Sequence, residues 1–437
     1  MKQKNKLKMT QVVTLKQTEN AFVPAKEISD PKKFAGRGEY VRDAYLALMS
    51  EGGNIAIVGN RGIGKSSLAR QIIKISQGDN ELLSKLNIHH DEKLDYLSVY
   101  LACGNSIQNT EQLMERLLTT RACLAEWIYE IPSASKEISK LTGGANIGVA
   151  KIGGDDTDES TKNAALQKHS IESVFINVLY DLQKSSVAKN GILIVIDEFD
   201  QIVDPTGFAS LLKSCATNLP YLKFCIIGVA QDIHNLMKEH QSADRLFAGS
   251  VINLPSMNDD ELEEIINNAE LSINNLISFN DDAKRRIITL ANGHPYIVHL
   301  IGKQAFRSAY FEGRYEELNE DYVDEVLKSI AEKEADPVLE GRYKKAVASS
   351  RSRETVLKVL SSNVRTDGEI YTTDAYKLAI EQDVDNPSQY VGHLVTEEYG
   401  AELVKLRDKH YRFKDSLFQT YVRARPILFT QPNPASE

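Results

Sequence analysis

The chain has 437 residues, of which 42% are apolar and 26% charged, and its formal net charge is −9. These proportions describe ordinary globular protein, and the length allows two or three domains. The acidic balance argues against a surface that is basic throughout, as a dedicated nucleic-acid-binding protein often has. Four scattered cysteines without C-x-x-C spacing indicate neither a zinc site nor a disulfide framework.

The N-terminal residues 1–20 are basic and polar, which predicts a flexible tail. They lack the apolar stretch of a signal peptide, and no apolar run long enough to span a membrane follows them. We therefore expect a cytoplasmic protein with no membrane partner.

The region 21–255 is the predicted core domain. A turn-rich lead-in is followed by a helix over 39–50, and strands and helices then alternate, which predicts an α/β fold with a doubly wound parallel sheet and helices on both faces. An insertion at about 140–165 is rich in glycine and then in acids, so we expect a flexible segment or, alternatively, a partner-binding loop. The predicted strands cover 55–58, 96–101, 193–196, 224–229 and 250–254.

The first predicted strand leads into a phosphate-binding loop. Its sequence is Gly59-Asn60-Arg61-Gly62-Ile63-Gly64-Lys65-Ser66, which fills every fixed position of G-x-x-x-x-G-K-[ST]. An amphipathic helix follows from Ser67, so the loop N–H groups and the helix N-terminus would together surround an anion. Lys65 would reach the β- and γ-phosphates, and the Ser66 hydroxyl would ligate Mg²⁺. The loop and Ser67 thus predict a nucleoside triphosphate site, against the alternative of a plain glycine turn.

The segment Gly191–Asp200 has the form of a Walker B motif, an apolar run that ends in carboxylates. Asp197 would hold the magnesium ion, directly or through water. Glu198 is placed to orient or deprotonate the attacking water. We expect Asp200 to cap a helix. The alternative is that these acids merely end a buried strand.

Two further domains are predicted after the core. The pattern is helical throughout 256–335, which indicates a small helical lid, and Asp336-Pro337 reads as its boundary. The predicted lid helices lie within 259–266, 281–291, 295–311 and 320–334.

The last domain, 336–437, shows three helices and then two strands, which is the order of a winged helix. The helix that usually reads DNA in such a module has no Lys or Arg and ends in two acids. A structural or protein-binding module is therefore favoured over a DNA reader. The basic residues of the predicted wing are Lys405, Arg407, Lys409 and Arg412. The predicted helices are 343–361, 374–380 and 387–398, and the strands are 401–407 and 411–413.

These motifs, in this order, resemble the AAA+-related P-loop ATPases, in particular their origin-recognition-like and STAND branches. The likeness covers most of the chain from Phe22 onward and implies ATP with Mg²⁺ as the ligand; no guanine-reading N-K-x-D motif follows the Walker B strand. The lead-in Phe34-Ala35-Gly36-Arg37 is similar to a segment that packs around the adenine in that group, although Glu39 lies one position early. The resemblance therefore implies base contacts by Phe34 and Arg37.

Three more roles come from the resemblance. Gln231, just after the strand at 224–229, occupies the sensor 1 position, with a helix-capping Asp232 as the alternative. Arg245 lies in a segment similar to S-x-x-R-F, which implies an arginine finger acting in cis or in trans, against a plain surface arginine. Pro295 matches the G-x-P signature of STAND proteins, although proline also suits the first turn of any helix.

The predicted function is an ATP-dependent molecular switch. ATP and Mg²⁺ would close the lid and reposition the winged helix, so that the protein assembles into a homo-oligomer or engages a protein partner, and slow hydrolysis would reset it. Prokaryotic relatives imply a role in defence or signalling. The first alternative is a DNA-binding ATPase of the origin-recognition or transposition-helper type. The second is a nucleotide-stabilised scaffold that hardly hydrolyses ATP.

Overall fold

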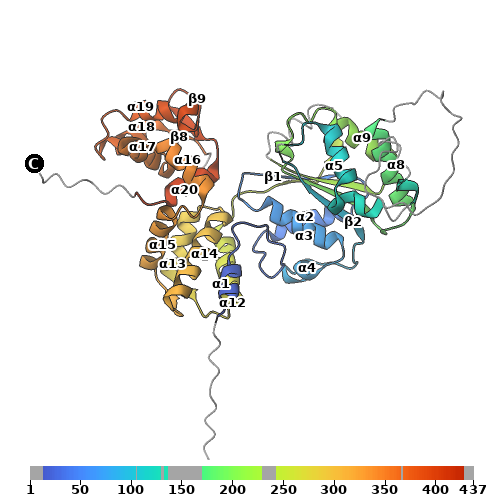
Figure 1. Cartoon of the computed structure of the whole chain (residues 1–437), viewed down its shortest axis with the longest axis horizontal. Coiled ribbons are helices and arrows are strands. Elements are labelled where there is room, and N and C mark those ends of the chain that lie inside the picture. Colours follow the sequence, from blue (N-terminus) through green and yellow to red (C-terminus); the bar gives the residue numbers. More distant parts are fainter. Residues whose placement is uncertain are drawn as a thin grey trace, which may run out of the picture. The chain divides into compact units, whose positions relative to one another are not determined.

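The computed structural model describes residues 13–104, 106–128, 132–135, 170–228, 243–365 and 368–427, and Figure 1 draws their helices and strands. The described chain divides into two compact units. The first, here called the sheet unit, holds Gly38–Gly59 and Lys65–Leu254. The second, here called the helical unit, holds the described parts of Met1–Arg37, Asn60–Gly64 and Pro255–Glu437. The predicted borders between core, lid and winged helix stay a prediction.

The sheet unit is built, among its described residues, on five parallel strands in the order β2-β3-β4-β1-β5. β3 and β4 are buried along their whole length, as expected for central strands covered on both faces. Every predicted strand is present, with ends within about two residues of those expected. The bounds are β1 Ile55–Val58, β2 Tyr96–Ala102, β3 Gly191–Asp197, β4 Leu222–Gly228 and β5 Val251–Asn253.

Helices cover both faces of this sheet, so the predicted fold class is confirmed. Alternate residues of β3, among them Ile192 and Ile194, share a hydrophobic core with α5 (Thr110–Thr119), α8 (Ile171–Lys184) and α9 (Phe208–Asn218). On the other side α3 (Lys65–Ser76) contacts the central strands and α2 (Gly38–Met49). Figure 1 shows α2 and α3 on one side and α5, α8 and α9 on the other. Shorter helices are α4 (Glu81–Lys85), a π-helix (Arg121–Ala125), α6 (Glu126–Ile128) and α11 (Ala243–Leu246).

The region 256–335, which the sequence predicts to be a lid, has the predicted helices. A correction concerns the prediction that it is helical throughout, because β6 (Ser278–Phe279) and β7 (Glu317–Leu318) form a parallel pair. Strands of two residues show no readable period, so the sequence pattern could not indicate them. The helices are α12 (Asp259–Ser272), α13 (Asp281–Ala291), α14 (Pro295–Glu312) and α15 (Glu320–Glu332).

The predicted flexible tail is too long. Residues Leu15–Ala21 form helix α1, whose first turn is closed by a capping box between Thr14 and Gln17. Nε of Arg307 in α14 donates a hydrogen bond to Oε1 of Glu19 at 2.5 Å. Phe22 is fully buried beside Phe306, with ring centroids 5.0 Å apart. These contacts order the chain from α1 onward.

The C-terminal part has the strand and helix order of a winged helix, which agrees with the predicted fold class. Its described strands form a sheet in the order β8-β10-β9. The bounds are α16 Pro337–Val347, α17 Arg351–Ser362, β8 Ile370–Tyr371, α18 Thr372–Ile380, α19 Pro387–Leu394, β9 Leu403–Arg407, β10 His410–Phe413 and α20 Ser416–Ala424.

Three predictions for this part are corrected. The single helix expected over 343–361 is two helices, because Ala348 and Ser349 adopt φ of 43° and 56°, which ends α16. The helix expected to reach 398 ends at Leu394 and is followed by a short 3-10 turn. β8 and α20 were not predicted. β8 is too short to show a period, and only two residues separate the start of α20 from the end of β10.

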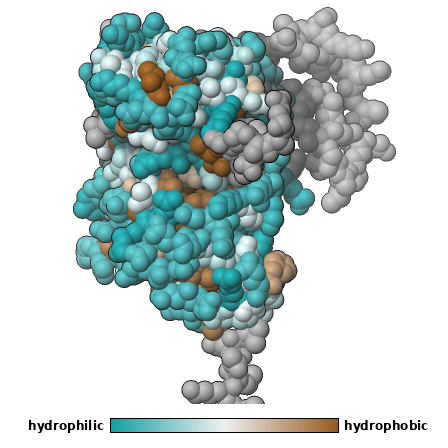
Figure 2. Space-filling model, turned by 90° about the vertical axis from the view of Figure 1, so that its left-hand side faces the viewer, coloured by the Kyte–Doolittle hydropathy of each residue, from teal (hydrophilic) through white to brown (hydrophobic). Residues whose placement is uncertain are grey.

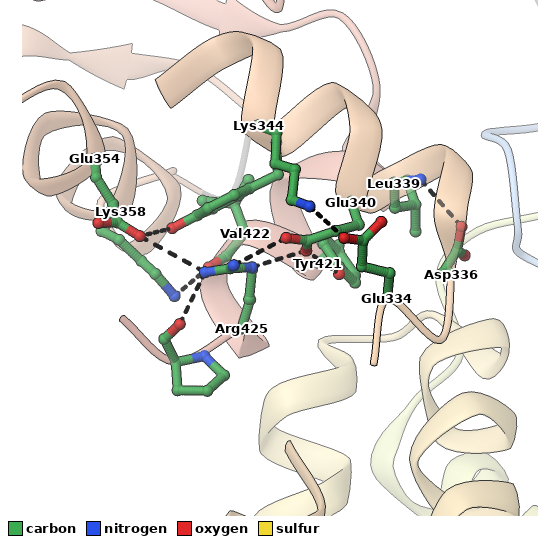
Figure 3. A network of polar contacts seen from close by, with 12 residues as sticks. Glu334, Asp336, Leu339, Glu340, Lys344, Glu354, Lys358, Tyr421, Val422 and Arg425 are labelled. Atoms are coloured by element: carbon green, nitrogen blue, oxygen red, sulfur yellow. Dashed lines mark hydrogen bonds and ion pairs between the residues drawn. The ribbon is translucent and has the colours of Figure 1, made fainter. Parts of the chain in front are cut away.

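A buried polar network holds α20 against α16 and α17. Arg425, one residue beyond α20, donates from Nε to Oε2 of Glu340 at 2.8 Å and from Nη2 to Oε1 at 2.9 Å. Tyr421 donates to the same Oε2 at 2.8 Å, and Arg425 Nη1 lies 3.6 Å from Oε1 of Glu354. Figure 3 shows these side chains converging on the guanidinium. Because the charges are buried, each depends on its partner.

No described helix is both long and apolar enough to cross a membrane. Figure 2 shows one face of the molecule, on which hydrophilic side chains cover most of the described surface and hydrophobic ones lie in small separate groups. Small separate groups of this kind are normal on a protein surface.

Candidate nucleotide-binding site

The phosphate-binding loop connects β1 to α3, as predicted. Gly59, Gly62 and Gly64 adopt φ of 156°, 75° and 98°, values in or at the edge of the region that favours glycine. Lys65 is the first residue of α3, and its Nζ donates to the carbonyl of Gly59 at 2.9 Å. The N–H groups of a first helical turn have no partner within the helix, so this end of α3 presents donors and a partial positive charge. Such a loop suits a phosphate group.

The Walker B carboxylate lies at the edge of the sheet where β1 ends and the loop begins. Ile196 in β3 is level with Ile226 in β4, which is level with Ala56 in β1. Asp197, the last residue of β3, is therefore level with Ile57 in β1. Two strand spacings separate β3 from β1, so the backbones of these two residues are about 10 Å apart. Parallel strands all point their carboxyl ends to one edge, and ligands of open α/β sheets bind there.

Asp197 is buried, at 3% exposed, and both of its carboxylate oxygens accept hydrogen bonds. Oδ1 accepts the backbone N–H of Glu198 at 2.8 Å, and Oδ2 accepts the hydroxyl of Tyr100, in β2, at 2.6 Å. A carboxylate oxygen can accept a second interaction, so these bonds leave room for a metal ion or its water. Hydroxyl and carboxylate oxygens are the donors that Mg²⁺ prefers, so Ser66 and Asp197 fit that ion.

Glu198 has a strained backbone and an exposed side chain. Its φ of 55° and ψ of 41° are left-handed, which costs a residue with a Cβ about 1–3 kcal/mol. Strain of this kind is common where a side chain must be held in a particular direction. The expected cap by Asp200 is wrong, because Asp200 lies inside the 3-10 turn Phe199–Gln201 and Glu198 takes the cap position.

The lead-in segment belongs to the helical unit, and its backbone is hydrogen-bonded to α12. The N–H of Gly36 donates to Glu264 at 2.9 Å and that of Arg37 to Glu261 at 2.7 Å. The Arg37 side chain, 4% exposed, donates from Nη2 to the carbonyls of Ile63 at 3.2 Å and Pro255 at 2.7 Å. Arg37 therefore supports the loop backbone directly. Phe34 is also buried, at 4% exposed, and the base contacts of both residues stay predictions.

The G-x-P segment lies at the start of α14, where Pro295 is the first helical residue, as expected. His294 is the N-cap residue and is 2% exposed, and burial lowers its pKa to about 4 although Asp415 acts in the opposite direction. The Tyr296 hydroxyl donates to Asp336. Burial raises the pKa of Tyr296 and Arg61 of the loop opposes that rise, so the loop lies within electrostatic reach of this segment.

The remaining predicted residues are less well placed. Gln231 and Asp232 fall outside the described residues. Arg245 is exposed in the short helix α11, and its role stays a prediction.

Two residues near the carboxylate were not predicted. Tyr100 contacts Asp197, and Arg70 of α3 lies over the Tyr100 ring, with Cζ 3.5 Å from its centroid. One signal was present, since Tyr96, Ser98 and Tyr100 alternate along β2 and so share one face of the strand.

Comparisons with known proteins show the family and the fold. The family model described as Novel STAND NTPase 1 matches residues 25–295, more than half of the chain. The chain belongs to this family. It is therefore a STAND NTPase, a P-loop protein whose matched segment contains the loop and both Walker B acids. Among curated proteins, none matches this STAND NTPase in sequence.

Solved structures are similar in fold. A Walker-type ATPase of Pyrococcus abyssi has 16% sequence identity and a TM-score of 0.50, covering 91% of this chain and 99% of its own. Cdc6p of Pyrobaculum aerophilum has 12% identity and a TM-score of 0.46, covering 93% and 96%. Orc1 of Aeropyrum pernix, solved in complex with DNA, has 14% identity and a TM-score of 0.40, covering 89% and 92%. At these identities the likeness concerns the fold of the STAND NTPase alone.

Proposed function

We propose that this STAND NTPase is an ATP-binding and ATP-hydrolysing switch that couples its nucleotide state to its winged helix. The contact between Leu417 and Gly62 carries the proposal. A Cβ on Gly62 would lie 3.0 Å from Cδ2 of Leu417, the second residue of α20, and both residues belong to the helical unit. The loop that would hold the phosphates therefore packs against a helix of the winged-helix part.

The chemical roles follow from the residues at the sheet edge. Lys65 would bind the β- and γ-phosphates, Ser66 and Asp197 would hold Mg²⁺, and Glu198 would orient or deprotonate the attacking water. Bound magnesium would neutralise charge that develops on the transferring phosphoryl group. Gln231 and Arg245 are proposed as further groups that respond to the γ-phosphate.

The first turn of α20 is well placed to respond to the loop. Arg342 of α16 pairs with Asp415, the N-cap of α20, at 2.7 Å and with Glu402 at 2.6 Å, so α20 is held firmly to its own domain. A change at Gly62 would thus be passed to the domain as a whole. A nearly complete switch needs about 5.5 kcal/mol of differential nucleotide binding between the two states, which several phosphate contacts can supply.

The output is proposed to be assembly into an oligomer or engagement of a protein partner, in defence or signalling. The effector chemistry is proposed to belong to that partner.

The test uses the Glu198→Gln variant, which should bind ATP without hydrolysing it. Its solution mass by light scattering and the hydrogen exchange of α20 are compared in ATP–Mg²⁺ and in ADP. We expect α20 to exchange differently in the two nucleotides and the Lys65→Ala variant to show no difference. A larger mass in ATP supports assembly, and a constant mass with altered exchange supports a switch that acts as a monomer. Identical exchange and mass in both nucleotides contradict the switch.

A DNA-binding role is the alternative, and the ion pairs of the wing weigh against it. Arg407 donates to both carboxylate oxygens of Glu369, at 3.1 and 2.7 Å, and Arg412 lies 4.0 Å from the same residue. These ion pairs neutralise part of the positive charge that the wing would need to bind DNA phosphates. Salt-sensitive DNA binding that disappears in the Lys405→Glu, Arg407→Glu double variant would favour the alternative.

A further inference from the structure

We propose that Tyr100 is a positioning residue for the magnesium site and that Arg70 holds it in place. Together they form a brace from the phosphate-loop helix α3, across β2, to the Walker B carboxylate on β3. The inference rests on the proposed magnesium-dependent nucleotide binding, and all of its residues lie in the sheet unit.

Strand register brings Tyr100 to the carboxylate. Tyr100 is paired with Val195 in the parallel ladder of β2 and β3, and paired residues point to the same face. The side chain of Asp197, two residues beyond Val195, points to the same face, because side chains alternate along a strand. The tyrosine hydroxyl covers the remaining distance and donates to Oδ2 at 2.6 Å. A bond this short to a carboxylate is of the strong, charge-assisted kind.

The same face of β2 meets α3. The hydroxyls of Ser98 and Ser76 are 2.7 Å apart, and the Arg70 guanidinium lies 3.5 Å above the Tyr100 ring centroid. A guanidinium at that distance stacks on the ring and limits its motion. The ring therefore has a support that does not depend on the hydroxyl.

The brace connects the two groups that would hold the ion. Ser66 and Arg70 are four residues apart in α3, so they lie on one side of the helix. A series of contacts thus runs from α3, which carries Ser66 and Arg70, through Tyr100 to Asp197. With the N–H of Glu198 on Oδ1 and the phenol on Oδ2, the carboxylate plane is fixed from both ends. Outer partners of metal ligands act in this way, and their loss commonly weakens metal binding by about 10–100-fold.

The experiment measures Mn²⁺ binding to the protein–ADP complex by electron paramagnetic resonance, since Mn²⁺ uses the oxygen ligands that suit Mg²⁺. ADP affinity in EDTA is measured alongside. Tyr100→Phe keeps the ring and removes only the hydroxyl. We expect it to bind Mn²⁺ about tenfold or more weakly with unchanged ADP affinity in EDTA. Tyr96→Phe is the matched control, because Tyr96 also donates one hydrogen bond from β2, to the carbonyl of Leu48 at 2.8 Å.

Arg70→Met tests the second part of the brace. Alone it should weaken Mn²⁺ binding in the same direction, with partial recovery in Arg70→Lys. Added to Tyr100→Phe it should have little further effect, because its influence passes through the hydroxyl.

The outcomes separate the two proposals. Wild-type affinity for Mn²⁺ in Tyr100→Phe, or an equal loss in Tyr96→Phe, overturns the inference while the proposed function stands. Fully additive losses overturn the role of Arg70. A wild-type protein that binds no Mn²⁺ in the presence of ADP overturns the proposed function itself.

Discussion

Leu417 of α20 packs against Gly62 of the phosphate-binding loop, although the two residues are far apart in sequence. The place that a Cβ on Gly62 would take is 3.0 Å from Leu417 Cδ2, and Gly62 has a φ of 75°. Both the conformation and the close approach therefore require glycine here. In the proposed switch this contact would link the nucleotide state to α20, and it can be tested with a truncated side chain.

Leu417→Ala should loosen the loop and speed the release of a fluorescent ADP analogue, as measured by stopped flow. Because Leu417 is 6% exposed, the variant should also lose about 2–5 kcal/mol of stability. Leu403→Ala is the matched control, since Leu403 is 1% exposed and lies in β9. If both variants release ADP equally fast, the effect is one of general stability and the contact has no special role.

Lys65→Ala should weaken nucleotide binding by about 10–100-fold, because a hydrogen bond to a charged group contributes about 1.5–3 kcal/mol. Isothermal titration with ATP measures the change. Lys74→Ala is the control on the same helix, where Lys74 pairs with Asp79 at 3.3 Å. Undiminished ATP binding by the Lys65→Ala variant would contradict the assignment of the loop.

Glu198→Gln should retain ATP binding and lose hydrolysis by about 10²–10⁴-fold, the usual contribution of a general base. Phosphate release under single-turnover conditions gives the rate. Asp200→Asn, two residues away in the 3-10 turn, should keep most of the activity. A Glu198→Gln variant that hydrolyses ATP at the original rate would show that the base lies elsewhere.

Two buried histidines should make the fold sensitive to acid. Burial lowers the pKa of both His294 and His299 to about 4, and the Nδ1 of His299 accepts the N–H of Val23 at 3.3 Å. The unfolded chain, with ordinary histidine pKa values near 6.5, binds more protons between about pH 4 and 6.5. Stability is therefore lost as the pH falls through this range, by about 3 kcal/mol for each histidine.

Thermal unfolding between pH 7 and pH 4.5 measures this loss. The His294→Gln, His299→Gln double variant should show a shallower decline, whereas His89→Gln, which changes an exposed side chain, should follow the original protein. Parallel pH curves for the double variant and the original protein would contradict the assignment.

Arg425→Met should destabilise the helical unit by about 3–5 kcal/mol, because it leaves Glu340 as a buried charge without its partner. Glu340 is 0% exposed and accepts two hydrogen bonds from Arg425. Denaturant unfolding measures the change. Arg423→Met, in the last turn of α20, should cost much less. A similar cost for both variants would show that the network adds no stability of its own.

Local chemistry was readable from the sequence by itself. The loop Gly59–Ser66, the acids Asp197 and Glu198, and the five strands follow from short motifs and from apolar runs that extend over few residues. The helix starts at Asp259, Asp281, Pro295 and Glu320 were readable for the same reason, since caps and periods are local properties. The errors arose where a backbone break, as at Ala348, or a two-residue strand left no period.

Tertiary structure alone decided which distant side chains meet at the loop and at the carboxylate. Tyr100 reaches Asp197 because β2 pairs with β3 in one particular register. Arg37 reaches the carbonyl of Ile63, and Leu417 reaches Gly62, through the packing of the helical unit. A shift of register by one residue would turn each side chain of a strand to the opposite face. Contacts of this kind depend on the order and pairing of whole elements, which no short stretch of sequence contains.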